Sequence, residues 1–165
     1  MNIVLDISKF TLGNTFFLDA KRNIIMEGSF TKIIYSNQFV TLNGIYLYLP
    51  IEIQSIDKIN NKNIMKFHPS SQLNTPLIQE LSRMEYRIVE YYKQLHNITK
   101  KTTCLLTRQL YMGNLKIYKD YADYGMKNLK DPAPHYIVKI SGIWETEEEI
   151  GTTYKIIECF TPRIV

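Results

Sequence analysis

One amphipathic helix in an otherwise strand-rich chain limits the folds open to this sequence. Between residues 76 and 96, apolar side chains recur at alternating steps of four and three, at Leu77, Leu81, Met84, Ile88, Tyr91 and Leu95. This spacing places a single apolar stripe along a helix of about five turns. Thr75 is a candidate N-cap, Pro76 suits a first helical residue, and Asn97 predicts the end of the helix. We expect the stripe to pack on a sheet.

Strand-like segments occupy most of the remaining sequence. Twelve tyrosines, seven phenylalanines and many β-branched residues favour strands. The part before the helix is typical of a β-meander: FFLD (16–19) and NIIM (23–26) as a hairpin, then SFTKIIYS (29–36), QFVTL (38–42) and YLYL (46–49). After the helix we expect strands at TTCLLTRQLY and NLKIYKDY and a long closing hairpin. The predicted fold is mainly β (α+β): an OB-like small barrel or a curved antiparallel sheet with one packed amphipathic helix at about 76–96.

The size of the chain fits one domain, and its composition is that of a folded protein. At 165 residues it is long enough to bury a core of its own, so we expect a single domain over 1–165. No apolar run approaches the roughly 20 residues that span a bilayer, and the opening residues resemble no secretory signal. Cys104 and Cys159 are therefore expected to be free thiols in a reducing, intracellular compartment.

Signatures of catalysis and of metal binding are missing from the sequence. The three histidines are scattered, the two cysteines form no CxxC pair, and no phosphate-binding loop or nucleophile elbow occurs. Glu145, Glu147, Glu148 and Glu149 cluster at a hairpin turn, where such a run usually serves as solvated surface. We expect no enzyme, no cofactor and no metal site.

Aromatic side chains fill the strand faces that would ordinarily meet solvent. In NGIYLYLP (43–50), alternation places Ile45, Leu47 and Leu49 on a core face and Tyr46 and Tyr48 on the opposite face. Tyrosine is a good strand residue, so such rings can also pack beneath a helix or a loop.

Lysines accompany several of these rings. In NLKIYKDY, Lys116 and Tyr118 share one side of the predicted strand, and Tyr154 and Lys155 follow Trp144 across the closing hairpin. Rings that stack on bases, interleaved with cations that meet phosphates, form the binding surfaces of single-strand binding proteins.

Positive charge is concentrated in one part of the chain. The net charge is +4, and residues 98–130 contain seven cations against two carboxylates. A local excess of this kind is what a polyanionic partner requires. We predict phosphate contacts from the cations Lys32, Arg108, Lys116, Lys119, Lys139 and Lys155, and base stacking on the rings Tyr46, Tyr48, Tyr118 and Trp144.

The closing hairpin also carries a family resemblance. HYIVKISGIWETEEEIGTTYKIIECF combines an apolar strand, Gly-Ile-Trp, a polar turn and Gly-x-x-Tyr-Lys. With FTKIIYSNQFVTLNGIYL and RQLYMGNLKIY, it resembles small single-stranded-DNA-binding proteins of DNA viruses and related insect virus-like elements. The residues that match the hairpin pattern are Trp144, Tyr154 and Lys155. The acidic turn 147–149 departs from what a phosphate-binding groove would need.

The resemblance implies an OB-like protein that coats displaced strands during viral DNA replication or recombination, in the nucleus or cytoplasm of an infected cell. Our leading hypothesis is sequence-tolerant binding of single-stranded DNA, or RNA, together with self-association and without membrane contact. The alternative is a non-enzymatic viral structural or protein–protein interaction protein, because tyrosine is also enriched at protein interfaces. A weaker third hypothesis is a nuclease or other enzyme with dispersed carboxylates.

Overall fold

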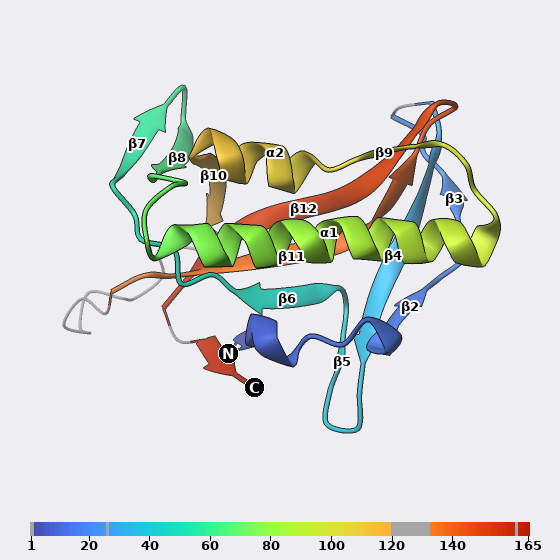
Figure 1. Cartoon of the computed structure of the whole chain (residues 1–165), viewed down its shortest axis with the longest axis horizontal. Coiled ribbons are helices and arrows are strands. Elements are labelled where there is room, and N and C mark those ends of the chain that lie inside the picture. Colours follow the sequence, from blue (N-terminus) through green and yellow to red (C-terminus); the bar gives the residue numbers. More distant parts are fainter. Residues whose placement is uncertain (1, 26, 120–132, 161) are drawn as a thin grey trace.

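A long β-hairpin forms the middle of the molecule (Figure 1). The computed structural model describes residues 2–25, 27–119, 133–160 and 162–165. The hairpin consists of β11 (His135–Glu145) and β12 (Glu149–Cys159). The other strands are β1 (Asn2–Val4), β2 (Thr15–Phe17), β3 (Lys21–Arg22), β4 (Ser29–Ser36), β5 (Thr41–Leu42), β6 (Ile45–Tyr48), β7 (Ser55–Ile59), β8 (Lys62–Lys66), β9 (Lys101–Thr103), β10 (Asn114–Lys119) and β13 (Pro162–Ile164). Two short 3-10 helices, η1 (Ile7–Lys9) and η2 (Leu12–Asn14), follow β1.

The strands form an open, mixed sheet. Its order is β2-β4-β11-β12-β10-β8-β7, with β3 and β5 also paired to β4, β6 to β11, and β9 to β12. Both β9 and β10 run parallel to β12, whereas β11 and β12 are antiparallel to each other. The small pair β1–β13 is separate and parallel. The mainly β class is therefore confirmed, but the sheet does not close into a barrel and is not purely antiparallel.

Two helices cover one face of the sheet, which we call the inner face. Helix α1 (Asn74–His96) lies across β11 and β12, and α2 (Leu105–Met112) lies beside it (Figure 1). The main core fills the space between the helices and the sheet. Its side chains include Ile33, Leu47, Ile88 and Val138, each 0% exposed. No helix in the described part of the chain is both long and apolar enough to cross a membrane.

The buried stripe of α1 is rotated slightly from the predicted one. Tyr92 is 3% exposed and lies in the core, whereas Leu95 is 54% exposed. The helix begins at Asn74, and Thr75 does not act as its N-cap. Asn97 ends the helix, as predicted from the sequence, and it adopts the left-handed conformation with φ of 52°. The stripe rotates because it also buries Glu85, a residue that the apolar pattern could not include.

Helix α2 replaces a predicted strand. Of the predicted segment 102–111, only Thr102 and Thr103 are extended, as part of β9 (Lys101–Thr103). Cys104 precedes α2 without capping it by its side chain. The carboxylate of Glu85, 0% exposed, accepts hydrogen bonds from the backbone N–H groups of Leu106 (3.1 Å) and Thr107 (2.8 Å). An anion at a helix N-terminus satisfies donors that have no partner within the helix, so α1 supplies the cap that the α2 sequence lacks.

The strand pairing predicted for the first hairpin is also wrong. Strands β2 and β3 do not pair with each other, and each pairs with β4. Residues 23–25 of the predicted NIIM strand are not extended, and Ile24 and Ile25 are 99% and 93% exposed. The strand predicted at 29–36 coincides with β4, and YLYL lies within one residue of β6.

Candidate nucleic-acid interface

The face of the sheet opposite the helices, which we call the outer face, collects most of the predicted residues. The register of the paired strands shows which face of the sheet each of these side chains lies on. Tyr46 lies opposite Lys139, Lys139 opposite Lys155, and Tyr118 opposite Ile157. Partners in register share a face, and residues two apart on one strand do so too. The outer face therefore carries Phe30 and Lys32 of β4, Tyr46 and Tyr48 of β6, Lys116 and Tyr118 of β10, Lys139 and Trp144 of β11, and Lys155 of β12.

Tyr118 has the densest arrangement of positive charge on this face. Its side chain is 38% exposed. The Nζ of Lys116 lies 4.5 Å from the ring centroid, and the Nζ of Lys155 from the neighbouring strand lies 5.3 Å from it. Both ammonium groups are attracted by the π-electrons of the ring. Two mobile cations therefore stand over an accessible aromatic surface, where each can turn toward a phosphate.

A second ring–cation pair lies on the other side of the β11–β12 hairpin, on β6 and β11. The Nζ of Lys139 is 5.0 Å from the ring centroid of Tyr46. Next to it, the hydroxyl of Tyr48 shares a hydrogen bond of 3.0 Å with Nδ1 of His135. Both tyrosines are half-buried and pack against a small second core formed by Val4, Ile137, Ile157 and Cys159. These rings are thus held in place by packing while one edge stays accessible.

A β-bulge brings Trp144 to this face. The register between β11 and β12 shifts between Ile140 and Gly142, so one extra residue separates Lys139 from Trp144. Without it, an odd spacing of five residues would place these two side chains on opposite faces. The indole ring covers Gly151, where an added Cβ would lie 2.7 Å from Cζ2, and Nε1 donates to the carbonyl of Thr152 (3.1 Å).

Phe30 belongs to the outer face but was not among the predicted site residues. Its ring covers Gly142, as Trp144 covers Gly151. The signal was present in SFTKIIYS, because alternation from Lys32 places Phe30 on the same side. Covering a glycine with a ring stabilises a strand that lacks a side chain at that point. Phe30 and Trp144 therefore have a structural role in addition to any contact with a ligand.

Three predicted residues lie elsewhere. Lys119 points to the inner side of β10, where its Nζ is 3.6 Å from the Glu158 carboxylate. Tyr154 packs against the main core, and burial, with the charge of Glu85 as a smaller cause, raises its pKa to about 12. Arg108 is exposed on α2, on the helix-covered side. None of the three joins the rings and lysines of the outer face.

Among the residues that the structure describes, the charged side chains at the centre of the outer face are all lysines. Within the described residues, its four lysines (Lys32, Lys116, Lys139 and Lys155) form no salt bridge, although three of them lie over tyrosine rings. Glu149 lies at the far end of the hairpin and pairs with Lys101 (3.4 Å). Lys127 and Lys130 of the basic stretch 98–130 lie outside the described residues.

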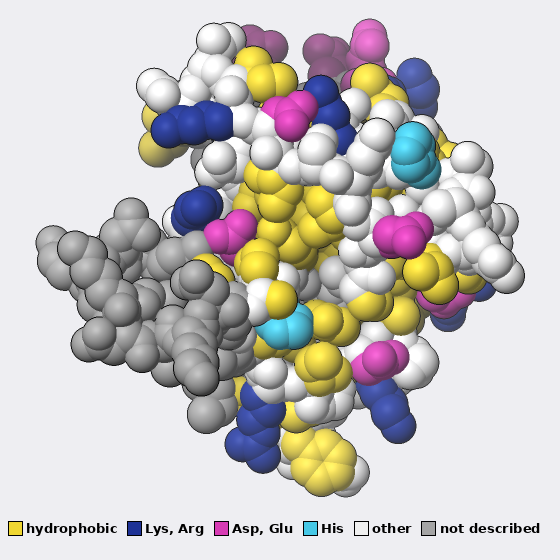
Figure 2. Space-filling view, turned by 90° about the vertical axis from the view of Figure 1, so that its left-hand side faces the viewer, with side chains coloured by type: hydrophobic (Ala, Val, Ile, Leu, Met, Phe, Trp, Pro, Cys, Tyr) yellow, Lys and Arg dark blue, Asp and Glu magenta, His cyan; other side chains and the backbone are white. Residues whose placement is uncertain are grey.

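Elsewhere on the surface, charges of both signs lie close together. The end of the molecule at β7 and β8 gathers hydrophobic side chains in its middle, surrounded by charges of both signs (Figure 2). There the carboxylate of Asp57 is paired with Lys66 at 2.7 Å, and this ion pair holds the pKa of Asp57 below its usual value. Within the described residues, no group of three or more His, Cys, Asp or Glu side chains is placed to hold a metal ion.

Comparison with protein-family models, with curated proteins and with solved structures finds no match for this chain. The arrangement of side chains on the outer face is therefore the best guide to function.

Proposed function

We propose that this protein binds single-stranded nucleic acid across the outer face, with bases on the exposed rings and phosphates on the lysines. The observation that carries the proposal is the position of Tyr118 between Lys116 and Lys155, which come from two adjacent strands. A base that stacks on Tyr118 displaces an ammonium group, and the displaced group then reaches the phosphate of the same nucleotide. Stacking accepts every base, so the binding is tolerant of sequence.

An open sheet suits this mode as well as a barrel does. Some RNA-binding domains place helices on one face of a four-stranded sheet and stack two or three bases on rings of the other face. Here α1 and α2 cover the inner face, and Tyr46 and Tyr118 lie at opposite sides of the β11–β12 hairpin. A strand that crosses β6, β11, β12 and β10 meets a ring, two lysines and a second ring in turn. The role in viral replication or recombination is an expectation from the resemblance alone.

Salt dependence tests the phosphate contacts. With four lysines on the outer face, the logarithm of the affinity for an oligo-dT strand should fall with the logarithm of salt with a slope of about −3. Trp144 emission provides the signal in a titration at several salt concentrations. The variant Lys139→Glu/Lys155→Glu should lower the affinity at low salt and reduce the slope by about half. The matched control, Lys58→Glu/Arg108→Glu, changes the charge equally at exposed cations outside the outer face and should keep most of the affinity.

Ring removal tests the stacking contacts. Tyr118→Ala should weaken binding by about 5- to 150-fold, the equivalent of one stacked base. Tyr111, 56% exposed on α2, supplies the control, and Tyr111→Ala should bind as the natural chain does. A duplex of equal length should bind more weakly, because its bases are already stacked. No binding at low salt, or equal losses in both tyrosine variants, would contradict the proposal and leave a protein interface as the use of this face.

A further inference from the structure

Among the described residues, the most exposed large apolar side chains lie together at one turn. Ile24 and Ile25, between β3 and β4, are 99% and 93% exposed. Single exposed hydrophobic residues are normal on protein surfaces, but two adjacent isoleucines in solvent lose the stabilisation that burial would give. They contribute nothing to the core of their own chain. This position indicates a surface that is covered in an assembly.

Acidic residues surround this turn. Glu27 is exposed in the same turn, and Glu147 and Glu148 are exposed in the neighbouring turn between β11 and β12. The two turns touch, because a Cβ on Gly28 would overlap the carbonyl of Glu145. We call Ile24, Ile25, Glu27, Glu147 and Glu148 the acidic tip.

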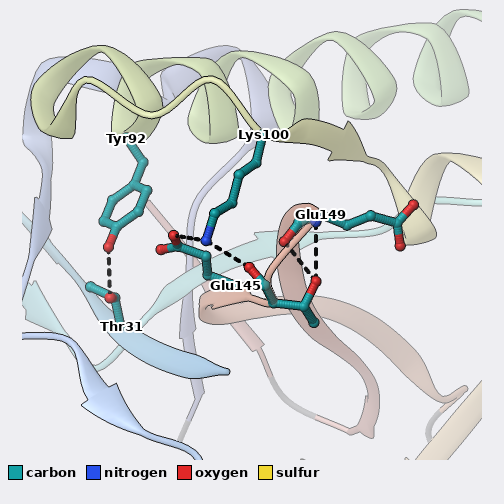
Figure 3. Close-up of polar contacts among 6 residues, drawn as sticks. Thr31, Tyr92, Lys100, Glu145 and Glu149 are labelled. Carbon is teal, nitrogen blue, oxygen red and sulfur yellow. Dashed lines mark hydrogen bonds and ion pairs between the residues drawn. The ribbon is translucent and has the colours of Figure 1, made fainter. Parts of the chain in front are cut away.

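Two of the four nearby cations are engaged. Lys100 donates to the Glu145 carboxylate (2.7 Å) and to the carbonyl of Thr146 (2.7 Å), as Figure 3 shows. Lys101 pairs with Glu149 (3.4 Å). Lys21 and Arg22 are exposed on β3 and offset part of the charge of the three glutamates. The acidic tip therefore presents an apolar centre with a small excess of negative charge around it.

A basic groove lies at the opposite end of β4. It has a volume of about 980 Å³ and is lined by Ile3, Leu5, Phe39 and Val40 together with Lys9 and Arg163. Phe39 is 80% exposed, and neither Lys9 nor Arg163 lies in a salt bridge with another described residue. Asp6 accepts hydrogen bonds from Ser8, and these bonds, with the charge of Lys9 as a smaller cause, hold the pKa of Asp6 below its usual value. The Asp6 carboxylate therefore offsets part of the charge of Lys9, whereas Arg163 has no acidic partner among the described residues.

We propose that the acidic tip of one copy of this chain docks in the basic groove of a second copy. Two isoleucine side chains fit a volume that can hold a drug-sized molecule. Glu27, Glu147 and Glu148 would face Lys9 and Arg163, so the charges are complementary as well as the apolar surfaces. The turn before β4 supplies the tip and the turn after it lines the groove, at opposite ends of one strand (Figure 1).

Such a contact joins different surfaces of the two copies, so it repeats from copy to copy instead of closing a simple dimer. Eight residues of β4 separate tip from groove by about 26 Å. If the proposed function holds, successive copies place their outer faces along one strand of nucleic acid, and binding becomes cooperative. The contact between copies does not itself depend on the proposed function.

Sedimentation of the protein without nucleic acid tests the contact. At about 100 μM, where a contact of micromolar Kd is largely formed, the natural chain should sediment as a concentration-dependent series of oligomers. The tip variant, Ile24→Asp/Ile25→Asp, and the groove variant, Phe39→Asp/Arg163→Glu, should each be monomeric. Both change exposed side chains, so circular dichroism should show that the fold is intact. High salt should weaken the association of the natural chain.

Mixing the two variants gives the sharpest test. The tip variant keeps its groove and the groove variant keeps its tip, so an equimolar mixture should form a dimer of one copy of each and nothing larger. A matched control, Ile56→Asp/Ile59→Asp on β7, alters two other exposed isoleucines and should associate as the natural chain does. A natural chain that stays monomeric, a tip variant that still associates, or a mixture that stays monomeric would overturn the proposal.

Discussion

The two faces of the central sheet satisfy their polar and aromatic groups in different ways. On the inner face, the main buried polar groups have fixed partners: Glu85 accepts four hydrogen bonds, and Tyr92 shares one with Thr31 (2.9 Å, Figure 3). The hydroxyls of Thr15 and Ser82 are the exceptions among the described residues. On the outer face, the rings of Tyr46 and Tyr118 have lysine ammonium groups over them. Hydrogen bonds to a buried carboxylate fix a structure, whereas a solvated lysine can leave its ring at low cost. The inner face specifies the fold, and the outer face is free to exchange partners.

Removal of the Glu85 carboxylate should have the largest effect on stability. Glu85→Ala leaves the N–H groups of Leu106 and Thr107 and the hydroxyl of Thr152 without their acceptor in a buried site. The free energy of unfolding should fall by about 3 kcal/mol or more. Urea unfolding followed by circular dichroism measures this loss.

The control for this change is Glu80→Ala, which removes an exposed carboxylate paired with Arg83 on the same helix. Its effect should stay below about 0.5 kcal/mol. Equal losses of unfolding free energy in the two variants would contradict the stabilising role that we assign to the Glu85 cap of α2.

The reactivity of the Cys104 thiol should reflect its burial and the nearby charge of Glu85. Burial, and then the charges of Glu85 and Glu90, raise its pKa to about 11 from the ordinary 9.0. Because the thiolate is the reacting species, Cys104 in a Cys159→Ala chain should react with Ellman's reagent at pH 8 about 100-fold more slowly than in the unfolded chain. Its rate should keep rising up to about pH 11, whereas the rate in the unfolded chain levels off above about pH 9. Equal pH profiles would contradict this.

Gly151→Ala should have a smaller effect, centred on the contact between β12, β9 and Trp144. The new Cβ would overlap the carbonyl oxygen of Thr103 and lie 2.7 Å from Cζ2 of Trp144, so both β9 and the indole must shift. We expect a loss of about 1–3 kcal/mol in stability and a red shift of the tryptophan emission. Thr153→Ala, on the same face of β12 and half-buried, is the comparison and should leave the emission unchanged. An unshifted emission in Gly151→Ala would mean that Trp144 is not packed as described.

Local patterns predicted some features well. The period of α1, its end at Asn97 and the two faces of β6 all follow from neighbours along the chain. Helix α2 could not be predicted in this way, because its N-terminal cap comes from Glu85, about twenty residues earlier in the sequence. Nor could the parallel pairing of β10 with β12, which puts Lys155 over Tyr118.

The candidate site shows the same limit. Alternation correctly put Lys116 and Tyr118 on one face, and it should also have excluded Tyr154, which is adjacent to Lys155 and must point to the other side. Trp144 joins Lys139 only through the bulge near Ser141, and no local pattern revealed that extra residue. Register and bulges depend on contacts between distant segments, so they became visible only in the folded chain.

Chemical-shift mapping of the folded chain with a short oligo-dT strand tests the division between the two faces most directly. At low salt, the largest changes in the amide signals should fall on β6, β10, β11 and β12, around Tyr46, Tyr118, Lys139 and Lys155. Signals from the solvent-facing residues of α1 and α2, Arg108 among them, should stay in place. Changes centred on the helices, or none at any salt concentration, would contradict the account.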